Sequence, residues 1–234
     1  MNSLCVILAR GGSKGIKNKN LASLCQKPLI QHTIEAAIES AVFDRVVVST
    51  DDKRISEISI RAGAEVPFVR PHYLSEDDVL SKDALIHAVE ECEKIYKCKF
   101  DIISELQCTS PMRNHVHIKE AFEIISNKKE IDSVISVRKL NHFHPLKIKK
   151  IINGKIIDLC DHFIEKQIGR RQDCEMFYTR NGAMFLMTRE CILEKGNRVG
   201  DISLPYVMDD ISSINIDNMI DLRLAEIFMD ERSA

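Results

Sequence analysis

The residues best suited to chemistry lie near the start of the chain, where an apolar run breaks into a glycine-rich, cationic loop. The apolar run covers residues 4–9, and the loop reads Arg10-Gly11-Gly12-Ser13-Lys14-Gly15-Ile16-Lys17-Asn18-Lys19-Asn20. Glycines let main-chain N–H groups approach phosphate oxygens, while Arg and Lys side chains bring cationic donors to the same place. The loop therefore predicts a binding site for a polyphosphate.

Two common nucleotide-binding motifs are missing from this loop. It lacks the G-x-x-x-x-G-K-[ST] of a P-loop, because no Ser or Thr follows a correctly spaced Gly-Lys. It also lacks G-x-G-x-x-G, so a nicotinamide or flavin cofactor is not indicated. A Lys- and Gly-rich surface turn is the alternative that the loop by itself leaves open.

Composition narrows the class of protein. The 234 residues include 33 Lys and Arg against 35 Asp and Glu, a net charge of −2, so we expect no nucleic-acid partner and only local phosphate chemistry. The hydrophobic fraction of 44% is typical of one globular domain with a sizeable core, here spanning 1–234. Eight scattered cysteines contain no C-x-x-C pair, which argues against a zinc site or a disulfide framework.

The apolar segments of the sequence are too short to act as a signal peptide or a membrane span. The first apolar segment has six residues before Arg10, too short for a signal peptide, and no later stretch reaches the roughly 18–20 apolar residues that span a bilayer. We therefore expect a cytoplasmic protein without membrane contact.

Apolar runs and helical patterns alternate along most of the chain. The spacing predicts strands at 4–9, 45–50, 65–69, 100–106, 132–138 and 183–187, and helices at 29–41, 53–62, 81–97, 115–127 and 218–230. This rhythm predicts an α/β fold with a doubly wound, mostly parallel sheet. Ligands of such sheets bind beyond the carboxyl ends of the strands, so the residues to consider are those at 10–20, 51–52, 70, 107–113 and 138.

The rhythm is interrupted between about 139 and 176. Two strand-like segments, 147–152 and 155–159, flank Asn153-Gly154, the favoured turn of a β-hairpin. An inserted β arm of this kind either faces solvent or contacts another subunit. We favour subunit contact and expect a homodimer.

Three further segments have side chains suited to ligands. Segment 105–113 presents Gln, Thr, Ser and Arg without a nucleophile–base pair, which suits a polar ligand. Arg180, with Arg170 and Arg171 upstream, suits bidentate binding of a carboxylate, and a solvated basic face is an equal alternative. Asp209, Asp210, Asn215 and Asp217 offer oxygen ligands for Mg²⁺, although N-capping of the last helix is the favoured interpretation of this segment taken alone.

Taken in order, these segments resemble the motifs of the cytidylyltransferases that activate sialic acid and related nine-carbon keto-sugar acids as CMP-sugars, including legionaminic and pseudaminic acids. The opening motif, approximately I-P-A-R-G-G-S-K-G-x-x-x-K-N, resembles residues 8–20. L-Q-P-T-S-P-x-R resembles 106–113, with Cys108 in place of Pro. The remaining motifs resemble 70–71 with 77–81, 181–183 and 215–217, so the resemblance spans nearly the whole chain.

The resemblance implies a nucleotide-diphospho-sugar transferase-like fold with a protruding dimerisation arm, and a reaction between CTP and a keto-sugar acid. Arg10, Lys14 and Lys19 would hold the CTP phosphates, with Lys19 near the transferred phosphate. The nucleotide would also be bound by Ala9, Gly11, Gly12, Ser13, Asn20, Arg70, Ser81 and Asn181. Gln107 would contact the sugar acid, for which Arg170 and Arg180 are the candidate carboxylate ligands. Asp217, with Asn215, would hold Mg²⁺.

Asn215 departs from the pattern, since family members usually have a carboxylate there. Asn supplies a neutral carbonyl oxygen, which weakens the field on a divalent cation unless Asp209, Asp210 or water compensates. Two alternatives to the enzyme stay open: a catalytically idle nucleotide-binding regulatory paralogue, and a nucleotidyltransferase for another sugar class. His142 and His144 are candidates for a general base by position only.

Overall fold

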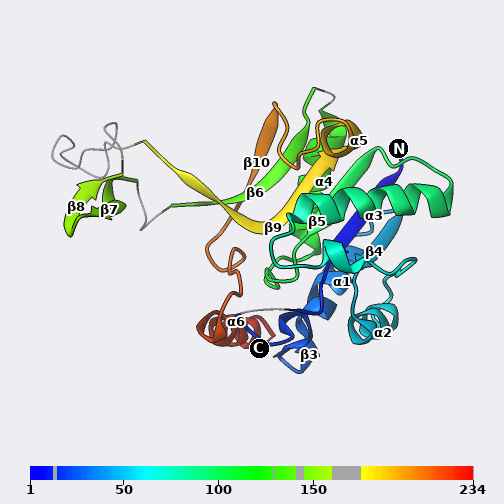
Figure 1. Cartoon of the computed structure of the whole chain (residues 1–234), viewed down its shortest axis with the longest axis horizontal. Helices are drawn as coiled ribbons and strands as arrows, with labels where there is room; N and C mark the ends of the chain where they lie inside the picture. Colours follow the sequence, from blue (N-terminus) through cyan, green and yellow to red (C-terminus); the bar gives the residue numbers. More distant parts are fainter. Residues whose placement is uncertain (13–14, 129, 141–144, 160–174, 234) are drawn as a thin grey trace.

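A six-stranded sheet forms the centre of the computed structural model, which describes residues 1–12, 15–128, 130–140, 145–159 and 175–233. The strand order is β10-β6-β9-β5-β1-β4 (Figure 1). The strands are β1 (Ser3–Leu8), β4 (Arg45–Ser49), β5 (Ile102–Leu106), β6 (Ser133–Lys139), β9 (Tyr178–Thr188) and β10 (Ser203–Met208). Parallel pairing joins β1 to β4 and β5, and β6 to β10, which confirms the mostly parallel sheet.

One strand runs against the others. β9 lies between β5 and β6 and is antiparallel to both. It is also longer than the predicted segment 183–187, because it begins at Tyr178. Its reversed direction places the beginning of β9 at the edge of the sheet where the parallel strands end.

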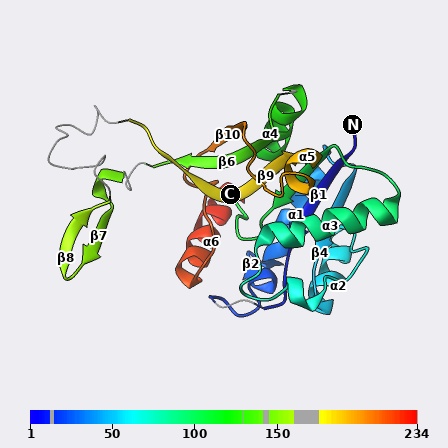
Figure 2. The ribbon, with the colours of Figure 1, turned by 45° about the horizontal axis from the view of Figure 1, so that its top comes forward.

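Helices cover both faces of the sheet. They are α1 (Leu29–Glu39), α2 (Lys53–Arg61), α3 (Ser81–Tyr96), α4 (His115–Asn127), α5 (Arg189–Leu193) and α6 (Met219–Ser233). Side chains of β1 alternate between the faces: Cys5 and Ile7 pack with α1, α2 and α4, whereas Leu4 and Val6 pack with α3 and α5. Figure 2 shows the ribbon of α3 crossing that of β1 on one side of the sheet. All residues of β1 up to Ile7 are buried, as expected for a parallel strand covered on both sides.

The structure differs from the sequence expectations in one predicted strand and in two elements that were not predicted. Residues 65–69 form only an isolated bridge between Glu65 and Val47, because Pro67 has no N–H to continue a ladder. β10 and the short helix α5 were not predicted. β10 is an edge strand interrupted by Pro205, a residue that weakens the strand pattern but is tolerated at an edge.

A third apolar cluster attaches the last helix beneath the sheet edge. Leu222 and Ala225 of α6 pack with Ile16 of the opening loop and with Ile214 and Ile216 of the segment before α6. The same region holds the short elements η1 (Lys19–Leu21), β2 (Ser23–Leu24) and β3 (Lys27–Pro28). This packing brings the opening loop and the segment before α6 together around one site.

The predicted hairpin is present and is separate from the main sheet. β7 (Lys149–Ile152) and β8 (Lys155–Asp158) pair antiparallel with each other and follow η3 (Pro145–Lys147). Asn153 and Gly154 both have positive φ, the conformation of a type I′ turn. Figure 1 shows this hairpin at a distance from the remainder of the described chain. The remaining short element is η2 (His72–Leu74). None of the helices in the described part of the chain is long and apolar enough to cross a membrane.

Candidate active site

Two adjacent pockets open at the edge where the parallel strands end. The first, of about 490 Å³, is bounded by the opening loop, the segment before α3 and the residues before α6. The second, of about 530 Å³, is bounded by the end of β5, the beginning of β9 and the residues before α6. Asp217 lines both pockets, so the two sites meet at its side chain.

The first pocket contains the cationic residues that the sequence singled out. Its polar lining includes Arg10, Gly12, Gly15, Lys19, Asn20, Arg70, Glu76, Asp77, Ser81 and Asp217. Arg10 Nη2 lies 2.7 Å from Asp77 Oδ1, and its Nη1 donates to the carbonyl oxygen of Ser75 (3.3 Å). The structure thus places Arg10, Lys19, Asn20, Arg70 and Ser81 around one cavity. Asn181, which the resemblance assigned to the same nucleotide, lines the second pocket instead.

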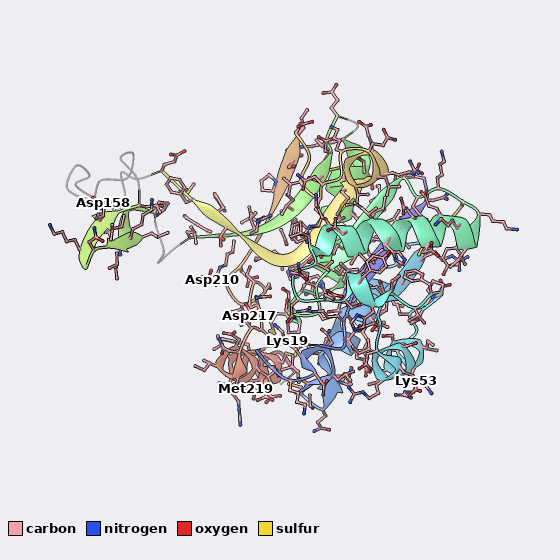
Figure 3. All side chains as sticks on the ribbon, viewed as in Figure 1. Lys19, Lys53, Asp158, Asp210, Asp217 and Met219 are labelled. Carbon is pink, nitrogen blue, oxygen red and sulfur yellow. The ribbon has the colours of Figure 1, made fainter. Side chains whose placement is uncertain are left out.

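Among the described cations of the opening loop, Lys19 has the least exposed side chain. Its side chain is 17% exposed, and Nζ donates to the carbonyl oxygen of Ile216 (2.9 Å) and to Asp217 Oδ1 (3.2 Å). Figure 3 shows Lys19 of the opening loop beside Asp217, which precedes α6. The ammonium therefore lies at the junction of the two pockets.

Main-chain packing shapes the opening loop. A Cβ added to Gly15 would lie 2.4 Å from the carbonyl oxygen of Asp217, so the loop can contact this segment only through a residue without a side chain. The N–H of Gly11 donates to Asp51 Oδ1 (2.9 Å), and Asn20 Nδ2 donates to the carbonyl oxygen of Arg10 (3.0 Å). These bonds hold the loop in its curved path.

Several predicted residues lie away from the first pocket's surface or outside the described chain. The side chain of Ala9 is fully buried in the core, and its N–H donates to the carbonyl oxygen of Ser49 (3.0 Å). Gly11 is held against Asp51 rather than lining the pocket. Outside the described residues lie Ser13, Lys14, His142, His144 and Arg170.

Arg70 is a buried member of the first pocket. Nε donates to Ser49 Oγ (3.0 Å), and Nη2 donates to the carbonyl oxygen of Ser49. Burial lowers the pKa of the Arg70 guanidinium to about 10, which leaves it charged at neutral pH. Ser81, at the start of α3, lies across the same cavity.

The second pocket holds two arginines and several amides. Its polar lining comprises Gln107, Arg138, Thr179, Arg180, Asn181, Ser213, Asn215, Asp217, Asn218 and Asp221. Arg138 lies within β6 and pairs in register with Thr179 of β9. Arg138 and Arg180 together give this pocket a donor set suited to a carboxylate.

The second pocket confirms Arg138 as one of the residues to consider beyond the strand ends, and it adds Asp221, which the sequence did not single out. Thr179 and Ser213 lie in segments that the sequence singled out, but neither had an individual role there. Their proximity depends on β9 running antiparallel beside β6.

Asn181 and Gln107 form the wall between β5 and β9. Asn181 is nearly buried, and its Nδ2 donates to Ser213 Oγ (2.9 Å). Gly182 has φ +77°, and a Cβ there would lie 2.9 Å from Gln107 Oε1. A side chain at position 182 would push the Gln107 amide out of place, so this close approach depends on glycine.

Asp217 is oriented from both sides. Asn215 Nδ2 donates to Asp217 Oδ2 (2.7 Å) while Lys19 contacts Oδ1, and the Asp217 N–H donates to Asp221 Oδ2 (2.8 Å). Among the described residues, no group of three His, Cys, Asp or Glu side chains is arranged to hold a metal ion. Asp217 is the carboxylate that lines both pockets.

The side chain of Asp209 stabilises the local turn and does not line the site. Its carboxylate accepts from the N–H (2.7 Å) and the hydroxyl (2.8 Å) of Ser212. Neither Asp209 nor Asp210 lines either pocket. In this structure they do not compensate for the missing carboxylate at position 215.

Arg113 differs from its sequence interpretation as a residue that contacts a polar ligand. The side chain is 1% exposed and lies inside the core, where its guanidinium donates to two main-chain carbonyls. The motif at 106–113 therefore contributes Gln107 to the second pocket and keeps its arginine inside the fold.

Comparison with known proteins identifies the family. The sequence profile of the family described as "Cytidylyltransferase" matches residues 4–151. The chain is 34% identical to CMP-N,N'-diacetyllegionaminic acid synthase of Legionella pneumophila, covering 98% of this chain and 97% of that protein. It is 33% identical to pseudaminic acid cytidylyltransferase of Campylobacter jejuni, over 97% and 96%.

A third relative is longer than this chain. N-acylneuraminate cytidylyltransferase of Escherichia coli is 33% identical over 95% of this chain, which spans only 51% of that relative. Among solved structures, CMP:2-keto-3-deoxy-manno-octonic acid synthetase complexed with CTP superposes with a TM-score of 0.73 at 16% identity, covering 99% of this chain and 100% of that one. That structural likeness confirms the fold, and the sequence matches show the family. The chain belongs to the cytidylyltransferase family.

Proposed function

We propose that this protein transfers CMP from CTP to the anomeric hydroxyl of a nine-carbon keto-sugar acid and releases pyrophosphate. The observation that carries the proposal is the meeting of two pockets at Asp217. One pocket is lined by Arg10, Lys19 and Arg70, as a triphosphate requires, and the other by Arg138 and Arg180, as a sugar carboxylate requires. The names of the most similar relatives support the same pair of substrates.

The chemistry is a displacement at the α-phosphorus of CTP. The anomeric oxygen forms a bond to phosphorus, the bond to the bridging oxygen of the β-phosphate breaks, and its electron pair leaves with pyrophosphate. The hydroxyl proton passes to a base, for which His142 and His144 stay candidates from the sequence. Such reactions depend mainly on positioning and charge neutralisation, which explains a site rich in cations and without a nucleophile.

Each pocket has a defined task in this scheme. Lys19, at the junction, neutralises charge on the phosphate that is transferred, while Arg10 binds the other phosphates. Gln107 and Asn181 orient the sugar ring, and Arg138 with Arg180 binds its carboxylate. The nucleotide and the acceptor thereby approach each other beside Asp217.

Mg²⁺ is the proposed cofactor, and the residues present fit it through one carboxylate. Protein sites commonly hold Mg²⁺ by one or two carboxylates together with substrate phosphates and water. Asp217 lines the triphosphate pocket and meets this requirement. Asn215 donates its amide N–H to Asp217, so it acts by orienting that carboxylate. When bound, the ion offsets charge on phosphate oxygens.

We also propose that the protein is a homodimer whose subunits meet through the hairpin of β7 and β8. Ile151 and Ile156 are cross-strand partners and are 78% and 75% exposed. An isolated two-stranded hairpin is marginally stable in water, and apolar side chains at this exposure favour a covering surface. A second copy of the chain supplies an identical hairpin and closes the contact by symmetry.

The experiment that tests the reaction measures pyrophosphate release from CTP and Mg²⁺ with a panel of nine-carbon keto-sugar acids. UTP in place of CTP is the control for the nucleotide. We expect release with CTP and with one or a few of the acids. Release with UTP and an unrelated sugar would instead support a nucleotidyltransferase for another sugar class.

A regulatory paralogue is the second candidate function, and Asn215 is the observation that favours it. With an amide in place of a carboxylate, CTP would bind without turnover. Tight CTP binding by calorimetry, together with no pyrophosphate release on any acid, would establish that alternative. A cytoplasmic location is part of either proposal and stays a prediction.

A further inference from the structure

Among the described residues, Arg113 has the largest of the fully buried side chains, and it lies in the core close to the end of β5. Its Nη1 donates to the carbonyl oxygen of Gln107 (3.3 Å), just past the end of β5, and to that of Ala183 (3.1 Å) in β9. One guanidinium nitrogen thus joins the two strands that run antiparallel side by side at this edge of the sheet.

The guanidinium is unusual because it has no acidic partner. Nε and Nη2 find no hydrogen-bond acceptor among the described residues, and the titratable groups that act on the charge of Arg113 are the buried thiols of Cys5 and Cys108. Burial lowers the pKa of Arg113 to about 10, so it stays charged at neutral pH. A buried charge without a counter-ion is unfavourable for folding, and an apolar side chain would fill the same space at less cost.

The position of Arg113 suits it to hold two segments of the second pocket at a fixed distance from each other. The two carbonyls that it joins belong to Gln107, which lines the second pocket, and to Ala183, which follows the pocket residues Asn181 and Gly182. The Gln107 side chain lies so close to Gly182 that a Cβ there, 2.9 Å from Gln107 Oε1, would displace the Gln107 amide. A shift of β5 relative to β9 would therefore separate Gln107 from Asn181.

We infer that Arg113 is a positioning residue for the acceptor: by joining Gln107 and Ala183 it sets the spacing between the Gln107 and Asn181 side chains that orient the keto-sugar acid. Arg113 touches neither substrate in this arrangement and acts through Gln107. The inference rests on the proposed function, because the second pocket must be the acceptor site.

The test compares Arg113→Met and Arg113→Lys in steady-state kinetics with both substrates varied. In Arg113→Met the KM for the acid should rise about tenfold, the equivalent of one lost hydrogen-bonded contact, while the KM for CTP stays within twofold. Arg113→Lys keeps the charge but has a single ammonium in place of the planar fork, so we expect at least a threefold rise. If Arg113→Met does not fold, Arg113→Lys decides the question.

A matched control separates positioning from general loss of stability. Ile125→Ala opens a cavity under α4, away from both pockets, and should lower the melting temperature without moving either KM. A merely structural Arg113 would behave like Ile125, with less active protein but unchanged KM values. That result, or an equal rise in both KM values, overturns the inference.

The failure of the inference differs from the failure of the proposed function. If the wild type releases pyrophosphate with an acid and both Arg113 variants retain the wild-type KM for it, only the inference fails. If the wild type is inactive with every acid, the proposed function fails and the inference fails with it.

Discussion

The ammonium of Lys19 lies where the two pockets meet, and this position makes it the most informative single residue to change. We expect Lys19→Ala to lower kcat at least about a hundredfold, because an interaction with the developing charge is lost. Lys19→Arg should also fail substantially, since a planar fork does not replace a compact ammonium. Pyrophosphate release measures the rate, and circular dichroism checks that the fold is retained.

Lys53 provides the matched control for Lys19. It is an exposed lysine at the start of α2 and lines neither pocket, and Figure 3 shows it well apart from Lys19. Lys53→Ala should keep the wild-type kcat. A wild-type kcat in Lys19→Ala would remove Lys19 from the reaction.

Gly15 and Gly12 give a second comparison at the residue scale. A Cβ on Gly15 would meet the Asp217 carbonyl oxygen at 2.4 Å, whereas a Cβ on Gly12 meets nothing within 4 Å. We therefore expect Gly15→Ala to lower stability by about 1–3 kcal/mol, as overpacking does. Gly12→Ala should melt at the wild-type temperature. Thermal unfolding of the two variants side by side tests this, and equal melting temperatures would contradict it.

At the scale of elements, a forked ion pair joins α3 to α5. Arg189 Nε and Nη2 donate to the two carboxylate oxygens of Glu93 (2.8 and 2.9 Å), and the N–H of Phe100 donates to Oε1 (3.2 Å). The hydrogen bonds from Arg189 hold the pKa of the Glu93 carboxyl below its ordinary value. A carboxyl with a lowered pKa in the folded state stabilises the fold above its unfolded-state pKa and loses that contribution as pH falls through the folded-state value.

Glu93→Gln should therefore destabilise the protein near neutral pH and have a smaller effect in acid. We expect a loss of about 1.5–3 kcal/mol at pH 7, the usual contribution of a hydrogen bond to a charged group, and a smaller loss as the pH falls below about 4. Urea unfolding at both pH values measures the difference. Glu57→Gln, at an exposed position of α2, is the control and should match the wild type throughout. A Glu93→Gln deficit that is the same at both pH values would contradict the assignment.

At the scale of the whole molecule, the hairpin of β7 and β8 decides the proposed assembly. Replacing both Ile151 and Ile156 by Lys should convert a dimer into a monomer, because each buried isoleucine contributes about 1.5–3 kcal/mol to an apolar contact. Light scattering after gel filtration measures the mass. Ile60→Lys, at an exposed position on α2, should leave the mass unchanged. A wild type that is monomeric at high concentration would exclude the dimer.

Local patterns in the sequence were sufficient for the chemistry of the opening loop and for most of the fold. The predicted helices at 29–41, 53–62, 81–97 and 115–127 match α1 to α4 to within about two residues, since helical periodicity and capping residues are local signals. The Asn153-Gly154 turn predicted its hairpin for the same reason. Residues next to each other in the chain determine such features.

The tertiary structure alone decided where side chains from distant segments meet. The antiparallel direction of β9 brings Arg180 and Asn181 beside Gln107 and Arg138, and no local pattern specifies strand direction. The same holds for Arg113, which reads as a polar loop residue in sequence but lies in the core because the loop folds back under β5 and β9. Burial and strand order depend on the packing of the whole chain, whereas the motifs that indicate the reaction consist of consecutive residues.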